Sequence, residues 1–225
     1  MQTEANPRAK PRFRGVSHEW GAYLAALAGV ILVVQAPSAS ASWAAGIYSV
    51  SLVALLGISA IYHRANWQPR ARAIMRRLDH SAIFVLIAGT YTPICILVLG
   101  EGQGAELLRL VWIGAGLGVA QSILWPTAPK PLVALLCVAL GWGAVWAWTP
   151  LSSSLSAQVL LFIVIGGVLY TLGAIAYALR RPDPWPDVFG YHEIFHALVL
   201  GASILHFSAV TQIVFEFGVA AGPSV

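Results

Sequence analysis

The sequence predicts an all-α integral membrane protein, a bundle of seven transmembrane helices with a cytosolic N-terminus and the C-terminus outside. Of its 225 residues, 58% are hydrophobic and only 10% are charged, and the mean hydropathy is +0.75. That composition is far more apolar than the composition of a soluble domain. The apolar runs are about 20 residues long, which suits membrane-crossing helices, whereas a membrane barrel needs alternating strands of about ten residues.

The polar start of the chain predicts a tail outside the membrane. Residues 1–16 carry four basic side chains, and Pro7 and Pro11 discourage a helix there. We therefore expect this segment to be a disordered cytosolic tail. The apolar part of the chain predicts a transmembrane domain over residues 17–218, so that residues 219–225 would form a short external tail.

The first apolar run has a second interpretation, as a cleaved secretory signal. A basic start, an apolar centre at residues 24–34 and small residues at 39–41 resemble such a signal with its cleavage site. However, the apolar helix can begin at Trp20, which makes it long enough to cross a bilayer. We therefore expect this helix to remain in the protein as its first span.

The seven expected spans follow one another with short polar connections. By residue number they are 17–36, 43–62, 78–99, 107–125, 132–148, 157–179 and 191–217. With a cytosolic N-terminus, all 13 basic residues except Arg109 lie in cytosolic segments. Because basic residues are enriched on the cytosolic side of a membrane, this asymmetry predicts the orientation. Spans 132–148 and 157–179 lack charged residues, so we expect them to serve as scaffold.

Four polar side chains fall at the cytosolic ends of these spans. His192 and His196 are four residues apart, so both imidazoles leave the same face of a helix about one turn apart. His63 ends the second span and Asp79 opens the third, at the same depth. Three imidazoles and a carboxylate that leave one position for water are the ligand pattern of a catalytic zinc site, although iron and copper also accept imidazole.

Each of these side chains has a simpler explanation when it is taken alone. A histidine inside a membrane span is often a hydrogen-bonded packing residue, and Asp79 is placed to cap its helix or to pair with Arg76 or Arg77. Ionisable groups are costly in lipid, however, and four of them share one depth. The combination therefore favours a metal site.

The other three histidines are weaker candidates. His206 lies ten residues beyond His196, about 15 Å along a helix, which is too far to share one ion, so we expect a polar contact within the bundle. His80 points about 100° away from Asp79 on its helix and would support the site at most. His18 stands at the start of the first helix, where a cap or an ion pair with the tail is expected.

Taken together, these residues resemble the hemolysin III family, within the larger superfamily of progestin and adiponectin-Q receptors and alkaline ceramidases. The matching pieces span nearly the whole chain in the expected order. They are SHEWG at 17–21, SAIYHRANW with Ser59 and His63, LDHSAIFVLIAGTYTP at 78–93, and the HxxxH of His192 and His196. The ExxN element that many relatives carry just before the first helix is missing here, and Glu19 follows the histidine instead.

The resemblance implies a seven-helix protein of the cell membrane with its N-terminus inside, zinc held by three histidines, and an aspartate that holds the zinc-bound water. Carried over by motif, His63, His192 and His196 would be the zinc ligands. Asp79 would be the partner of the water, and Ser59 would support the site.

These residues predict a zinc-dependent hydrolase of a membrane lipid amide or ester that enters from the bilayer. Asp79 would take a proton from the attacking water and return it to the leaving group, while Ser59 orients Asp79 or the intermediate. The expected partner is therefore a membrane lipid, as substrate or ligand, and we expect no nucleic-acid partner.

Two other functions fit parts of the sequence. Residues 192–196 spell HEIFH, the HExxH signature of zinc proteases with Glu193 as general base. Membrane-embedded proteases of this type take an aspartate from a later span, whereas Asp79 precedes the motif. The other possibility is a non-enzymatic protein with structural zinc, either a lipid sensor or a cytolytic pore. Spans with almost no polar residues argue against a wide pore and leave the sensor open.

Overall fold

The structure is a computed structural model that describes residues 10–219, so the tails expected at 1–16 and 219–225 lie largely outside the described residues. In chain order the helical elements are α1 (Val16–Gln35), α2 (Ala39–Arg64), α3 (Pro69–Pro93), η1 (Ile94–Gly104), α4 (Ala105–Leu124), α5 (Lys130–Gly141), η2 (Trp142–Ala147), α6 (Trp148–Ser154), α7 (Ala157–Leu179) and α8 (Tyr191–Phe217). Within residues 10–219, β-structure is limited to one isolated bridge between Trp185 and Phe189. The expected all-α class is confirmed.

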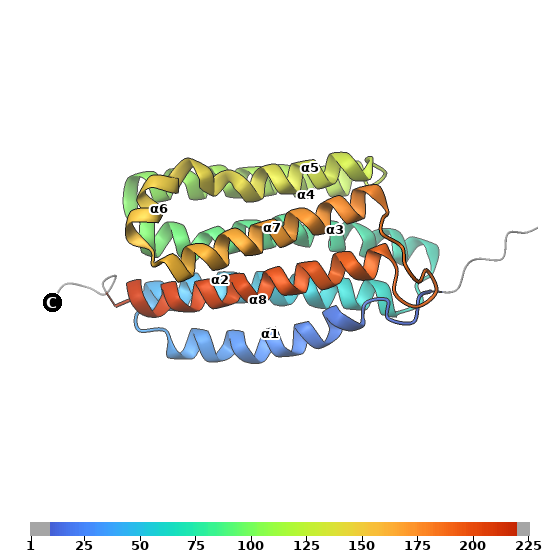
Figure 1. The fold of residues 1–225 in the computed structure, drawn as a ribbon, viewed down its shortest axis with the longest axis horizontal. Helices are drawn as coiled ribbons and strands as arrows, with labels where there is room; N and C mark the ends of the chain where they lie inside the picture. The colour runs from blue at the N-terminus through green and yellow to red at the C-terminus, as the bar shows by residue number, and fades with distance from the viewer. Residues whose placement is uncertain (1–9, 220–225) are drawn as a thin grey trace, which may run out of the picture.

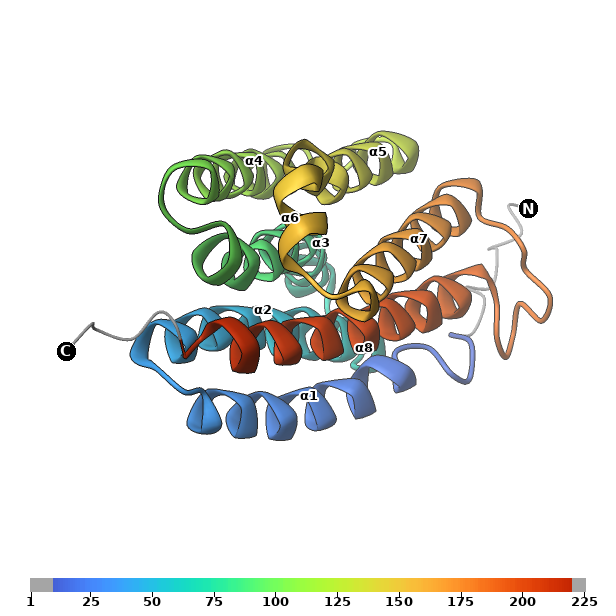
Figure 2. The same cartoon turned by 60° about the vertical axis from the view of Figure 1, so that its left-hand side comes forward.

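The long helices lie side by side, with α8 near the middle of the bundle. Figure 1 shows them running along the longest direction of the molecule, and Figure 2 shows α8 between α1 and α7. α1 packs against α2, α2 against α3, α3 against α4, and α7 against α8. Because α8 also contacts α2 and α3, residues of the second helix and of the last helix meet although they are far apart in the sequence.

Six stretches of the described residues are long and apolar enough to cross a membrane, one fewer than the seven spans expected. The difference arises because the expected spans 78–99 and 107–125 fall within one stretch, Pro69–Leu124. The helical path is broken inside this stretch, where φ is 64° at Gly100 and 86° at Gly102. Positive φ is costly for a residue with a Cβ atom, so the two glycines permit the break.

Beyond this break, α4 packs closely along α3. The ring of Phe84 in α3 lies so near Gly118 in α4 that a Cβ atom at Gly118 would overlap it. Trp112 Nε1 donates to Thr92 Oγ1 across the same pair of helices at 3.4 Å. Small residues such as glycine let two helices in a membrane approach closely, so a side chain at residue 118 would force the Phe84 ring or one of the two helices to shift.

The core between α2 and α8 is apolar, and so is much of the outer surface. Tyr48 and Leu56 of α2 and Ile213 of α8 are 0–1% exposed. On the outside, Leu124 is 82% exposed and Trp146 is 86% exposed. Large apolar side chains that point outward suit contact with lipid acyl chains rather than with water. The exposed apolar surface therefore agrees with a membrane-embedded bundle.

Residues 10–15, which we call the amino-terminal segment, run past the start of α8. The backbone N–H of Arg12 donates to Asp187 O at 3.1 Å, and that of Phe13 donates to Val188 O at 3.3 Å. The segment thereby pairs with the loop that precedes α8. This contact brings the first described residues to the end of the bundle where α2 ends and α8 begins.

Candidate metal centre

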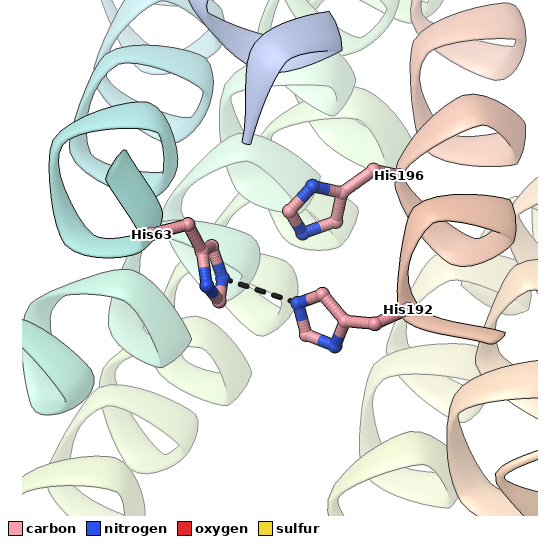
Figure 3. A group of neighbouring side chains, drawn as sticks. All are labelled: His63, His192 and His196. Atoms are coloured by element: carbon pink, nitrogen blue, oxygen red, sulfur yellow. Dashed lines mark hydrogen bonds between the residues drawn. The ribbon is translucent and has the colours of Figure 1, made fainter. Parts of the chain in front are cut away.

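Three histidines from two helices meet at this end of the bundle. α2 supplies His63 from its last turn, and α8 supplies His192 and His196 from its first turns. The ligand atoms of the three imidazoles all lie within 4.8 Å of one another. Figure 3 shows the three rings turned toward a common point. The structure therefore brings together the three residues that were predicted from the sequence to be metal ligands.

One pair of imidazole nitrogens has the spacing that a tetrahedral metal ion requires. His63 Nε2 and His192 Nε2 are 3.1 Å apart, and two nitrogens that bind one zinc ion at tetrahedral angles lie about 3.3 Å apart. The His196 ring centroid lies 4.9 Å from that of His63 and 4.5 Å from that of His192. The group can therefore hold a metal ion, and imidazole nitrogen is a ligand that zinc, iron and copper all accept.

The three histidines lie on the wall of a cavity of about 800 Å³, which Ser59 and Asp79 also line. This volume falls within the range of about 300–1,000 Å³ that is usual for small-molecule sites. A metal ion held by the three imidazoles would therefore face a space that admits a ligand. All five residues of the expected site thus share one cavity.

Asp79 lines the same cavity as the three histidines but lies outside the group whose ligand atoms are within 4.8 Å of one another. Its carboxylate is 3.6 Å from His80 Nδ1. Ser59 is 3% exposed and lines the same cavity. An aspartate in this place can act on a water molecule or a ligand in the cavity without binding the metal ion directly.

His18 is a neighbour of the site that the sequence did not indicate. Its ring stacks on the ring of His196, with centroids 3.9 Å apart and planes 10° apart. The residue is 2% exposed, and within residues 10–219 neither of its ring nitrogens has a hydrogen-bond partner. Stacking of two flat rings helps to fix the orientation of His196. The sequence feature that could have indicated His18 is its predicted depth in the membrane. His18 lies in the first turn of α1, at the same end of the bundle as the other histidines.

Glu193 is fully engaged in structural contacts. Its side chain is 2% exposed and forms an ion pair with Arg14 through one oxygen. The other oxygen accepts a hydrogen bond from the backbone N–H of Gly190 at 2.9 Å, which caps α8. A negative charge in the first turn also stabilises a helix. Both carboxylate oxygens therefore make structural contacts, and Glu193 is not among the described residues that line the cavity, which argues against the general base that the HExxH pattern requires.

His80 and His206 make polar contacts of their own. His80 Nδ1 lies 2.9 Å from Arg76 O, and its Nε2 lies 3.3 Å from Tyr177 Oη. His206 Nε2 lies 3.1 Å from Ile163 O, which is the polar contact within the bundle that we expected. Both histidines stand outside the group of three.

Comparison with known proteins finds similar chains that cover most of this sequence. The family model described as Haemolysin-III related matches residues 7–207, a range that includes all three histidines. Hemolysin-3 of Bacillus cereus is 33% identical over 198 residues, which cover 87% of this chain and 87% of that protein. The Hemolysin-3 homolog of Bacillus subtilis (strain 168) is 32% identical over 198 residues, covering 87% of this chain and 90% of that protein. The Adiponectin receptor protein of Drosophila melanogaster is 27% identical over 185 residues, covering 74% of this chain and 41% of that protein.

Proposed function

We propose, on the premise that this chain belongs to the haemolysin-III related family, that it binds zinc and hydrolyses an amide or ester bond of a membrane lipid. The chain is a multi-pass membrane protein, because it combines that family membership with six apolar helical stretches long enough to cross a bilayer. In the proposal, His63, His192 and His196 are the zinc ligands, and Asp79 and Ser59 act in the reaction.

One observation carries the proposal, the convergence of three imidazoles on the wall of a cavity that Asp79 also lines. Structural zinc usually has four protein ligands, whereas catalytic zinc has three and keeps one open position. The group contains three ligand residues among those described, so an ion bound by them retains a position for another ligand. This ligand number supports a catalytic role over a purely structural one.

In the proposed hydrolysis, the bound ion, two polar side chains and the cavity walls have separate roles. Zinc, when bound, supplies a Lewis acid that polarises a carbonyl group and lowers the pKa of water to about 7. In this proposal, the Asp79 carboxylate accepts a proton from the attacking water and returns it to the leaving nitrogen or oxygen of the lipid. Ser59, on the wall of the same cavity, orients that carboxylate or the reaction intermediate. The cavity walls bind the lipid and keep bulk water away from the reacting carbonyl group.

Lipid sensing without turnover is the second candidate function. The relative named Adiponectin receptor protein favours it, because a receptor binds its ligand without converting it. The name Hemolysin-3 points instead to cytolysis by a pore, but a pore needs polar residues along several spans and α7 has no charged residue. The same cavity serves a sensor as well as a hydrolase, so turnover separates the two.

We also propose that the chain crosses the membrane seven times, with its N-terminus in the cytosol and its C-terminus outside. The stretch Pro69–Leu124 has 56 residues, more than twice the number that one crossing needs, about 20. The break at Gly100 and Gly102 supports two crossings. Residues 17–218 then form the transmembrane domain, and the three histidines lie near the cytosolic face.

Metal content tests the zinc site. Wild type, His63→Ala and Asp79→Ala are purified in detergent and measured by elemental mass spectrometry. His206→Ala is the matched control, because its imidazole lies about 15 Å from His196 along α8. We expect about one zinc ion per chain in wild type and in His206→Ala, loss of zinc in His63→Ala, and largely retained zinc in Asp79→Ala. Absence of stoichiometric metal from wild type, even after zinc is resupplied, would refute the zinc site.

Turnover of lipid amides and esters on the same preparations then separates hydrolase from sensor. Asp79→Ala, still loaded with zinc, should lose hydrolysis by about 10²–10⁴-fold, because the proton acceptor is gone. Zinc-loaded wild type that binds lipid but cleaves none would establish the sensor instead.

A further inference from the structure

The charged side chains that line the cavity of the metal centre are almost all cationic. Five are basic and Asp79 alone is acidic; the basic ones are Lys10, Arg14, Arg72, Arg76 and Lys130. They come from the amino-terminal segment and from the starts of α3 and α5. These parts of the chain adjoin the end of α2 and the start of α8, so the cations gather at the end of the cavity that holds the three histidines.

Two of the five cations are tied to protein partners. Arg14 forms the ion pair with Glu193. Lys130 Nζ lies 3.2 Å from Tyr191 Oη and 4.2 Å from the centre of the Tyr177 ring. The carboxylate neutralises the charge of Arg14, and the aromatic rings hold Lys130 in place.

The charges of the other three cations are not neutralised by an acidic side chain among residues 10–219. These cations are Lys10, Arg72 and Arg76. Lys10 Nζ donates to two neutral oxygens, Ala65 O at 2.7 Å and Asn66 Oδ1 at 3.1 Å. Among residues 10–219, neither Arg72 nor Arg76 forms an ion pair. Burial, followed by the positive charge of Arg72, lowers the pKa of the Lys10 ammonium. Neighbouring like charges repel, so an anion placed between them would be stabilised.

Away from this rim, the lining of the cavity is largely apolar. Leu151 of α6 and Leu160 and Val164 of α7 line it toward the opposite end of the bundle. A small-molecule site usually combines apolar walls with a few polar groups that fix the orientation of the ligand. Here the polar groups are cations at one end, so the matching ligand has an acidic head and an apolar body.

We propose that the cavity binds an anionic amphiphile. Its acidic headgroup lies between Lys10, Arg72 and Arg76, and its acyl chain passes the three histidines into the apolar part of the cavity. This inference rests on the proposed function in one respect, because it names the class of lipid on which the hydrolase acts. Binding itself requires no metal ion.

Position in the cavity distinguishes this site from the general attraction of a basic surface. Basic residues are common at the cytosolic face of membrane proteins and attract anionic lipids without any pocket. Arg70 and Arg72 are both exposed in the first turn of α3, but only Arg72 lines the cavity. General attraction would depend equally on the two arginines, whereas a site in the cavity depends on Arg72.

Lipid retention tests the inference on the full-length protein in neutral detergent. Phosphatidylglycerol and phosphatidylcholine with identical acyl chains compete for the protein, and native mass spectrometry counts the lipid kept by each chain. We expect wild type to prefer phosphatidylglycerol and Arg70→Gln to match it. Arg72→Gln and Arg76→Gln should each reduce the preference about fivefold. Free glycerol phosphate should not displace the lipid, because it lacks the acyl chains.

Several results would overturn the inference. They are equal retention of the two lipids by wild type, equal effects of Arg70→Gln and Arg72→Gln, and displacement of the lipid by an equal concentration of glycerol phosphate. The proposed function fails separately. A preference for phosphatidylglycerol in a protein without zinc or hydrolysis refutes the hydrolase alone, and zinc-dependent hydrolysis without a headgroup preference refutes the anionic site alone.

Discussion

Gly15 sets how closely the amino-terminal segment approaches α2. Its φ is +79°, in the region that favours glycine, and a Cβ atom added there would lie 2.9 Å from His63 Cβ. Real Cβ atoms essentially never come so close to a neighbour. Any side chain at residue 15 must therefore displace either the segment or the histidine.

Gly15→Ala should disturb both the fold and the metal centre. We expect the free energy of unfolding to fall by about 1–3 kcal/mol, because alanine is strained at this φ, and zinc occupancy to fall because His63 has to move. Gly57→Ala is the matched control in α2, where an added Cβ meets no heavy atom within 4 Å. Thermal unfolding in detergent and metal content measure the two effects. Identical behaviour of the two variants would contradict the close approach.

For single residues, the sequence was sufficient to predict that His63, His192 and His196 converge. Helical spacing joins the last two, and a topology drawn from the basic residues puts His63 at the same depth. The stacking of His18 on His196 could not be predicted from the sequence. Spacing within one helix says nothing about which ring of another helix lies beside it, since many apolar contacts together determine how α1 packs on α8.

Among the elements, the start of α8 depends on a single carboxylate. Glu193 caps the helix through Gly190 and pairs with Arg14 of the amino-terminal segment. We expect Glu193→Gln to lower the free energy of unfolding by about 1.5–3 kcal/mol, because Arg14 loses its charged partner. Hydrolysis per zinc-loaded molecule should change little. Thermal unfolding and turnover normalised to zinc content measure the two quantities.

A general base at residue 193 would give the opposite pattern. Turnover would then drop by about 10²–10⁴-fold while stability remained. Arg14→Met is the matched control, because it breaks the same ion pair from the other side and leaves the carboxylate in place. It should destabilise the protein to a similar extent as Glu193→Gln.

Helices that consist of one apolar run could be predicted closely, and interrupted ones could not. The spans expected at 157–179 and 191–217 have the bounds of α7 and α8. α3 begins at Pro69 rather than at residue 78, since arginine and alanine are good helix formers that hydropathy alone passes over. Hydropathy also does not reveal backbone angles, so the change from α5 to the tighter helix η2 (Trp142–Ala147) was not foreseen.

For the whole molecule, the number of crossings decides on which side each loop lies. In a background of Cys95→Ala and Cys137→Ala, single cysteines at Arg70 and Ser153 report this when an impermeant thiol reagent is added from either side. Both positions are exposed. Seven crossings with a cytosolic N-terminus predict that Arg70→Cys is labelled from inside and Ser153→Cys from outside. Labelling of both from the inside would mean that Pro69–Leu124 crosses the membrane once.

The three histidines of the candidate metal centre come from the second helix and from the last, and His63 and His192 are 129 residues apart in the chain. A ribosome must therefore synthesise nearly the whole protein before α8 can reach α2. We expect a truncated chain, or one whose final helix fails to insert, to offer only His63 of the three histidines and to bind metal far more weakly. Metal occupancy would then indicate that the whole chain has been synthesised and that α8 has inserted. The ion would link α8 to α2, in a bundle that had formed before α8 was added.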